Sequence, residues 1–202
     1  MHSVESYATK IENGIKSFAV ARIEEAINLR QSDIKEEILM LTPSIEKNEL
    51  KMLIQNDITL TIGSLEEIKI LKEVVEKLKE ETNKKTELKK VKVHIKIDTG
   101  FGRYGFLYSD FVSILSAFKS IDENIEIEGL YTHFSETKDE KWTNLQYNRF
   151  LEVIEFLKKN GFSSDRIKIF TEREYNNDVD YLKKNIGKKH LICTIGGGNM
   201  GN

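Results

Sequence analysis

Short apolar runs rich in β-branched residues alternate along the chain with segments whose apolar side chains recur at helical spacing. The runs predict five strands, which cover residues 17–22 (SFAVAR), 37–43 (EILMLTP), 58–63 (ITLTIG), 91–100 (VKVHIKIDTG) and 125–134 (IEIEGLYTHF). The helical spacing predicts helices over residues 23–33, 45–56, 65–81 and about 143–160. Two weaker strands are predicted near Ile167 and Leu191.

Two serines mark expected helix starts. Ser44, three residues before Lys47, is a capping signal, and Ser64 with Glu67 forms a capping box. Strands that alternate with helices predict a parallel sheet with right-handed crossovers. Two architectures fit this pattern, an open doubly wound sheet and a closed eight-stranded barrel, and periodicity does not separate them.

Composition narrows the class of protein. The 202 residues are 39% hydrophobic and 32% charged, with a formal net charge of −2 and interspersed signs. Such a chain buries a core and does not predict binding to nucleic acid or to an anionic membrane. The single cysteine, Cys193, rules out a disulfide framework. No apolar leader or membrane span is evident, so we expect a cytoplasmic protein.

Candidate chemistry lies where predicted strands end, because in α/β folds the loops at the carboxyl ends of strands surround the open face. In KIDTGFGRYGF, residues 96–106, Gly100 and Gly102 allow a sharp bend, after which Arg103 projects. An arginine so placed suits an anionic group. An ordinary turn with a surface arginine fits these residues equally well.

His133 ends the apolar run GLYTHF. It is either a core histidine with its hydrogen bonds satisfied or a ring that contacts a bound planar ligand. Leu41, at the end of ILMLTP, would face the same open side of the sheet as Arg103 and His133. By itself it predicts only core packing.

Several of these segments resemble the pyridoxal-phosphate barrel of alanine racemases. KIDTGFGRYGF is similar to the family pattern K-[IVM]-D-T-G-M-G-R-x-G-[FV], and GLYTHFSETKDE to G-[IL]-[YF]-T-H-F-A-x-A-D-E. The resemblance covers about residues 1–162 and includes the segment from Gln146. It implies a partial TIM-type (β/α) barrel that lacks the family's first strand and its C-terminal β-domain.

The resemblance also implies roles for four residues around pyridoxal 5'-phosphate. Arg103 would contact the phenolic oxygen of the cofactor. Lys96, at a position that is carbamylated in some family members, would support Arg103. His133 would stand against the pyridine ring, and Leu41 would pack nearby.

The sequence departs from the family at the catalytic groups. The motif A-V-x-K-A-[ND]-x-Y-G-H-G, whose lysine attaches the cofactor covalently and acts as a base, does not occur in these residues. The downstream cofactor-phosphate segment H-x-A-N-S-A and the domain that carries the opposing tyrosine do not match either. We therefore expect no catalytic residue in this chain and no covalent attachment through the family position.

Residues 163–202 form a divergent tail. Its end, LKKNIGKKHLICTIGGGNMGN, weakly resembles the glycine-rich segment of polysaccharide pyruvyltransferases. A glycine-rich turn after a strand binds phosphate when a helix follows it. A frayed terminus is the simpler interpretation.

The expected function is that of an alanine racemase-like isomerase, which interconverts L- and D-alanine and supplies D-alanine for the cell wall. The family is homodimeric and acts on a small amino acid. We expect this chain alone to be incomplete, to bind the cofactor weakly and to be inactive. The alternatives are a non-catalytic remnant, or a pyridoxal-phosphate-binding protein without racemase activity. A glycan-modifying relative would rest on the tail alone.

Overall fold

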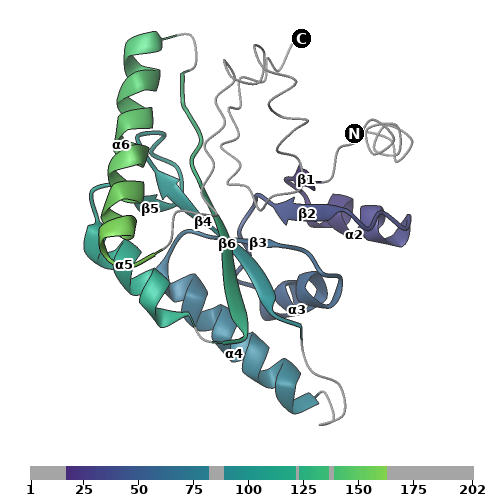
Figure 1. The fold of residues 1–202 in the computed structure, drawn as a ribbon. Coiled ribbons are helices and arrows are strands. Elements are labelled where there is room, and N and C mark those ends of the chain that lie inside the picture. The colour runs from purple at the N-terminus through teal and green to yellow at the C-terminus, as the bar shows by residue number, and fades with distance from the viewer. Residues whose placement is uncertain (1–16, 82–88, 122, 137–138, 163–202) are drawn as a thin grey trace, which may run out of the picture. The chain divides into compact units, whose positions relative to one another are not determined.

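A computed structural model describes residues 17–81, 89–121, 123–136 and 139–162. The strands are β1 (Ser17–Val20), β2 (Glu37–Met40), β3 (Leu60–Ile62), β4 (Val91–Asp98), β5 (Phe106–Leu107) and β6 (Ile125–Tyr131) (Figure 1). The helices are α2 (Ile23–Gln31), α3 (Lys47–Gln55), α4 (Leu65–Glu81), α5 (Phe111–Ser120) and α6 (Glu140–Lys159). The five strands and four helices expected from the periodicity are confirmed. The short β5 and the helix α5 were not anticipated, and the two weaker strands lie outside the described residues.

Strand order follows chain order. β1 pairs in parallel with β2, from Ser17 opposite Glu37 to Val20 opposite Met40. A parallel bridge joins Leu39 to Thr59 just before β3, β3 pairs with β4, and β4 also pairs with β5 and β6. A doubly wound sheet reverses its order at a switch point, whereas a barrel adds strands in sequence. The observed order therefore favours the barrel.

The described residues fall into two compact units. The first unit consists of the described residues within 17–62, 66–94 and 121–126. The second consists of those within 63–65, 95–120 and 127–162. β4 and β6 contribute residues to both units. The boundary expected near residue 162 coincides with the end of the described residues, so it stays a prediction.

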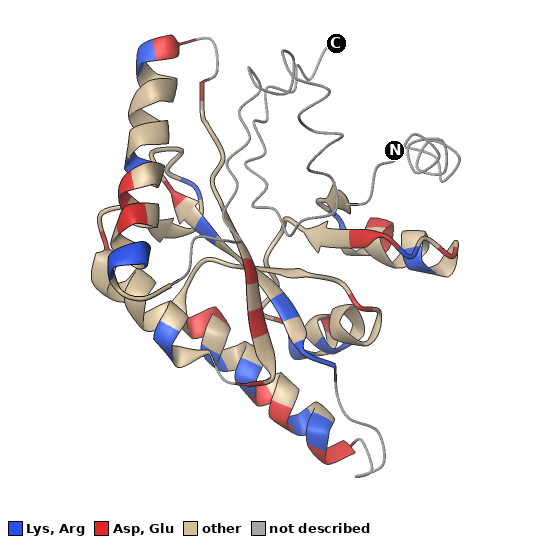
Figure 2. Ribbon diagram, in the orientation of Figure 1, with Lys and Arg blue, Asp and Glu red and all other residues tan. Residues whose placement is uncertain are grey.

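In the first unit, α4 buries one apolar side and exposes a charged one. The buried apolar side chains recur at helical spacing, and they are Ile68, Leu71, Val74, Val75 and Leu78. Lysine and glutamate make up most of the exposed side of the helix (Figure 2). Ion pairs join α3 to α4, from Lys47 to Glu73 at 2.8 Å and from Lys51 to Glu81 at 2.5 Å. Such exposed pairs contribute little, so the apolar side holds the helix.

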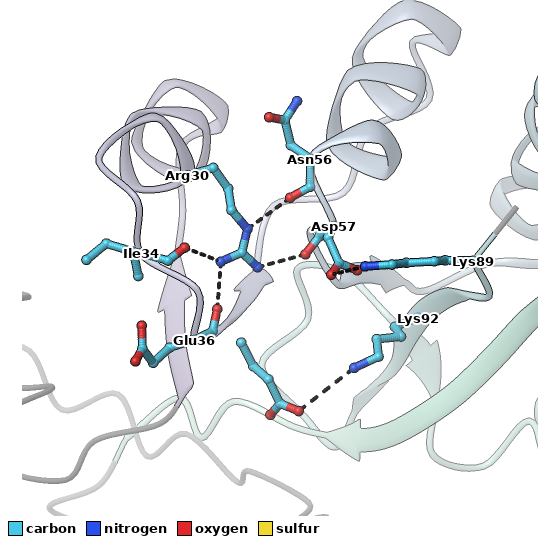
Figure 3. Close-up of polar contacts among 8 residues, drawn as sticks. Arg30, Ile34, Glu36, Asn56, Asp57, Lys89 and Lys92 are labelled. Atoms are coloured by element: carbon cyan, nitrogen blue, oxygen red, sulfur yellow. Dashed lines mark hydrogen bonds and ion pairs between the residues drawn. The ribbon is translucent and has the colours of Figure 1, made fainter. Parts of the chain in front are cut away.

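One arginine joins two loops of this unit. Arg30, near the end of α2, donates hydrogen bonds to four backbone carbonyl oxygens at 2.7–2.9 Å (Figure 3), those of Ile34, Glu36, Asn56 and Asp57. These carbonyls belong to the loops that precede β2 and β3. Contacts at the amino ends of barrel strands serve stability, whereas chemistry collects at the carboxyl ends.

Two helix starts differ from their predictions. α3 begins at Lys47 and its N-cap is Glu46, so the capping role predicted for Ser44 is wrong. Ser44 lies too far upstream, and its hydroxyl accepts a hydrogen bond from the Glu46 nitrogen instead. α6 begins at Glu140 because the Asp139 carboxylate caps it, accepting a hydrogen bond from the Trp142 nitrogen at 3.0 Å.

In the second unit, α5 and α6 lie side by side (Figure 1). Their aromatic side chains pack, with 4.7 Å between the ring centroids of Phe111 and Phe156. Phe150, Val153 and Leu157 of α6 are buried. No helix in the part of the chain that the structure describes is both long and apolar enough to cross a bilayer.

Candidate functional site

The carboxylate of Asp98 shapes the turn that follows β4. Asp98 is buried, with only 5% of its surface exposed. Its Oδ1 accepts hydrogen bonds from the nitrogens of Gly100 at 2.8 Å and Gly102 at 3.1 Å, and its Oδ2 accepts one from the nitrogen of Arg103 at 3.1 Å. Three backbone donors on one carboxylate hold the turn in a single conformation. The last residue of the strand thus positions the backbone of Arg103.

Glycines allow this turn to close. Gly100 and Gly102 have positive φ values of 137° and 75°. Gly105 also has a positive φ, 120°, and a Cβ there would lie 2.8 Å from the carbonyl oxygen of Lys96. Only glycine fits where the returning chain comes this close to β4.

Arg103 and His133 share a contact with the ring of Phe101. The guanidinium carbon of Arg103 lies 4.4 Å from the centroid of that ring. The His133 ring meets it edge-on, with 5.0 Å between centroids and an interplanar angle of 85°. Arg103 is exposed and His133 is half-buried. Both side chains therefore belong to one surface patch, although they come from loops after different strands.

Lys96 brings a second positive charge to this patch. Its side chain is buried, and its Nζ donates a hydrogen bond to the carbonyl oxygen of Tyr104 at 3.1 Å. Burial, followed by the charge of Arg103, lowers the pKa of Lys96, while Asp98 acts in the opposite direction. Burial is the larger cause, and the contribution of Arg103 adds to it because the two side chains carry like charges.

The same charges act on His133. Its pKa is lowered by burial first, then by Arg103 and by Lys96. The imidazole is therefore held in its neutral form more firmly than an exposed histidine. A neutral ring beside two cations forms a site that attracts a planar anion, because such a ligand offsets the positive charges without opposing a charged imidazole.

Side chains of α6 connect the two loops. Gln146 is fully buried; its Oε1 accepts hydrogen bonds from the nitrogen and hydroxyl of Ser135, and its Nε2 donates one to the hydroxyl of Thr99. Arg149 donates a hydrogen bond to the carbonyl oxygen of Thr99 at 2.9 Å. The Trp142 ring nitrogen donates one to the Ser135 hydroxyl at 2.6 Å. One helix thus holds the segments that carry Arg103 and His133.

The structure brings together three of the four residues that sequence reasoning selected. Lys96, Arg103 and His133 lie in one compact unit, and Leu41 lies in the other. The proximity of Leu41 to the other three therefore stays a prediction. Among the described residues, no cluster of three His, Cys, Asp or Glu side chains is suited to hold a metal ion.

Sequence reasoning missed the residues that support this site. Asp98 stands before Thr-Gly-Phe-Gly, an arrangement in which an aspartate commonly accepts hydrogen bonds from the following backbone. Gln146 shares helical spacing with Phe150, Val153 and Leu157, so it is a polar residue on an apolar face. That exception to the pattern was the available signal.

Comparisons with known proteins identify the family of this chain. The family model for the N-terminal domain of alanine racemase matches residues 1–169. The chain is 39% identical over 163 residues to an alanine racemase of Methanococcus maripaludis, covering 79% of this chain and 40% of that protein. It is 35% identical over 155 residues to alanine racemase 2 of Caldanaerobacter subterraneus, covering 75% and 37%. The chain thus spans about two fifths of the length of these relatives.

Solved structures give the same result. Alanine racemase of Clostridium difficile 630 superposes with a TM-score of 0.68 and 32% identity, covering 79% of this chain and 42% of that one. Its complex with cycloserine gives a TM-score of 0.69 and 30% identity over the same shares. This match decides between the two architectures in favour of the barrel. The chain belongs to the family of alanine racemase N-terminal domains.

Proposed function

We propose that the patch of Lys96, Arg103 and His133 holds pyridoxal 5'-phosphate, and that the chain takes part in interconverting L- and D-alanine. The observation that carries this proposal is that Arg103 and the half-buried imidazole of His133 both contact the ring of Phe101, on a patch to which the buried Lys96 adds a second cation. The relatives named alanine racemase supply the reaction. The chain spans only part of them, so the reaction is proposed from family membership.

The side chains present suit this cofactor. Its phenolic oxygen and its phosphate are anionic, and a guanidinium donates several hydrogen bonds to such oxygens. Arg103 is exposed and its backbone is held by Asp98, so we assign it the phenolic oxygen. His133, which already meets the ring of Phe101 edge-on, offers the contact to the pyridine ring.

Each residue of the patch has a separate task. When bound, the cofactor supplies an electron sink for the carbanion left by removal of the substrate's α-proton. Arg103 keeps a positive charge beside the ring and orients it. His133 stays neutral and so adds no competing charge. Lys96 holds the Tyr104 carbonyl and places a second charge beside Arg103.

Lys96 has a further possible state. Burial and the charge of Arg103 lower its pKa, which raises the fraction of neutral amine, and the neutral amine is the form that adds to carbon dioxide to give a carbamate and release a proton. The carbamate is an anion, so in this state Lys96 would no longer supply a second positive charge; it would pair with Arg103, as the family resemblance implies, and Arg103 would be the cation left to meet the cofactor. We propose this modification for Lys96.

The alternative function is cofactor binding without racemisation. The family motif with the covalent lysine is absent from these 202 residues, so we expect the chain assayed alone to racemise nothing. Family members act as homodimers on a small amino acid, and we propose the same partners for the protein in which this chain works.

Binding is tested with pyridoxamine 5'-phosphate, which has no aldehyde and so forms no imine with surface lysines. We expect saturable binding, followed by ligand fluorescence, and a dissociation constant about tenfold or more higher in Arg103→Met. Arg22→Met is the matched control, because Arg22 is an exposed arginine paired only weakly with Glu24 at 3.7 Å. Equal dissociation constants for the two variants would show that Arg103 does not contact the ligand.

Racemisation is tested separately. The 202-residue chain is incubated with L-alanine and pyridoxal 5'-phosphate, and D-alanine is measured with D-amino-acid oxidase. No D-alanine is expected from the chain alone. Its appearance above the level given by free cofactor would reject the binding-only alternative.

A further inference from the structure

Gln146 is a buried polar side chain that begins the otherwise apolar buried face of α6. Its exposed fraction is 0%, and its neighbours on that face, Phe150, Val153 and Leu157, are buried apolar residues. Burying an amide is unfavourable unless its hydrogen bonds are made, and a leucine or methionine would fill similar space without that cost. The presence of glutamine at this place therefore calls for a reason other than packing.

The hydrogen bonds of Gln146 reach both loops of the site. Oε1 accepts from the Ser135 nitrogen at 3.1 Å and from the Ser135 hydroxyl at 3.2 Å, two residues after His133. Nε2 donates to the Thr99 hydroxyl at 3.3 Å, directly after Asp98. The oxygen and the nitrogen of one planar amide thus form hydrogen bonds with two different loops.

The link continues through a pair of threonines. The hydroxyl oxygens of Thr99 and Thr132 lie 2.8 Å apart, and both side chains are fully buried. Because the Gln146 amide nitrogen can only donate, the Thr99 hydroxyl oxygen accepts there, and either threonine hydroxyl can donate in the bond between Thr99 and Thr132. Thr132 directly precedes His133. The connection between the loops is therefore continuous, running from Ser135 through Gln146 and Thr99 to Thr132.

We infer that Gln146 is a positioning residue, whose buried amide fixes the loop that carries Arg103 relative to the loop that carries His133. Its described hydrogen bonds go to Thr99 and Ser135 and not to the side chains of Arg103 or His133, so it acts through those two residues. The identity of the ligand in this inference rests on the proposed function, whereas the hydrogen bonds of Gln146 do not depend on it. Through these bonds, α6 sets the spacing of Arg103 and His133, which lie about 30 positions apart in the chain.

A purely structural role makes a different prediction. If Gln146 only stabilised α6, any variant that loosened the helix equally would weaken the site equally. Leu157→Ala provides this comparison, because Leu157 is buried on the same face and no described hydrogen bond links its side chain to either loop. A cavity of this kind destabilises a protein at least as much as the loss of the amide hydrogen bonds does.

The test compares Gln146→Met, Leu157→Ala and the unaltered 202-residue chain, at a temperature where circular dichroism shows all three to be folded. The first measurement is the dissociation constant of pyridoxamine 5'-phosphate. The second is the pKa of His133, followed by the NMR signal of its ring and assigned with His133→Gln. Burial, and then the charges of Arg103 and Lys96, lower that pKa, so it reports how the two loops surround His133 without any ligand.

For Gln146→Met we expect about tenfold weaker binding, because up to three hydrogen bonds between helix and loops are lost. We also expect the pKa of His133 to rise towards its ordinary value as the cations move away. Leu157→Ala should change neither quantity. Thr99→Val removes the hydroxyl at the other end of the link. Adding Thr99→Val to Gln146→Met should therefore weaken binding much less than Thr99→Val does in the unaltered chain.

The results separate the two proposals. An unchanged His133 pKa in Gln146→Met, or an equal rise in Leu157→Ala, overturns the positioning role. If the unaltered chain does not bind pyridoxamine 5'-phosphate, the proposed function fails, and the pKa comparison still decides the role of Gln146.

Discussion

The backbone nitrogen of Arg103 donates a 3.1 Å hydrogen bond to the carboxylate of Asp98, which ends the preceding strand. The exposed cation of the site is therefore held at its backbone by a buried anion. The flexible guanidinium needs this support, because its own side chain has many rotamers and the loop around it contains three glycines with positive φ.

Replacing Asp98 by asparagine tests this support. The remaining oxygen can keep the bonds from Gly100 and Gly102, but the new amide group meets the Arg103 nitrogen, a donor against a donor. We expect a loss of about 1–3 kcal/mol in the free energy of unfolding and a clear weakening of pyridoxamine 5'-phosphate binding. Chemical denaturation and ligand titration measure the two effects.

The control for this change is Asp110→Asn. Asp110 also accepts a hydrogen bond from a backbone nitrogen, that of Ser113 at 3.0 Å, but it is exposed at the start of α5. It should leave ligand binding unchanged. If both variants bind alike, the Asp98 carboxylate does not position Arg103.

Alanine substitutions at Gly102 and Gly105 distinguish the cost of a positive φ from the cost of a steric clash. Both have positive φ, yet a Cβ on Gly105 would lie 2.8 Å from a backbone oxygen, whereas one on Gly102 would meet nothing within 4 Å. Gly102→Ala should cost roughly 1–2 kcal/mol, the ordinary penalty of the left-handed region. Gly105→Ala should cost about 3 kcal/mol or more, because the β4 backbone has to move. Equal losses in thermal denaturation would show that the crowding at Gly105 is relieved at little cost.

His94 makes the stability of the fold depend on pH. Burial, and secondly the charge of Lys92, lower its pKa to about 4. In the unfolded chain the pKa is about 6.5, so acid protonates the unfolded form first. The contribution of neutral His94 to the free energy of unfolding is fully present above pH 7 and is lost as the pH falls from about 6.5 to about 4. The total is about 3 kcal/mol.

A pair of pH titrations measures the contribution of His94. The free energy of unfolding is determined at pH 7.5 and at pH 5 for the unaltered chain and for His94→Leu. The fall between these two conditions should be smaller in the variant, because leucine takes up no proton. A parallel fall in both proteins would mean that His94 titrates normally in the folded state.

Arg30 is expected to serve stability and not ligand binding. Arg30→Met removes four hydrogen bonds to the loops before β2 and β3, and should lower the free energy of unfolding by about 2–4 kcal/mol. Arg22→Met, at the exposed start of the same helix, should change it by less than about 0.5 kcal/mol. A marginal loss in Arg30→Met would mean that water replaces the guanidinium at those carbonyls.

Local pattern determined most of the elements of this protein. The runs from Ser17, Glu37 and Val91 are apolar and β-branched over a few residues, and that property depends on neighbours in sequence alone. The same holds for the bend at Gly100 and for the placement of Arg103 and His133 just after strands. The motifs around them were also sufficient to indicate the family, which the comparisons confirmed.

Tertiary structure alone decided which side chains meet. The shared contact of Arg103 and His133 with Phe101 depends on two loops about 30 residues apart in sequence. The role of Gln146 depends on α6 packing beside both loops. The short pairing of β5 with β4, from Ile97 to Phe106, likewise needs a turn whose closure no periodicity encodes. Sequence pattern specifies which residues can be buried or bend, whereas hydrogen bonds between distant segments form only when packing brings their donors and acceptors together.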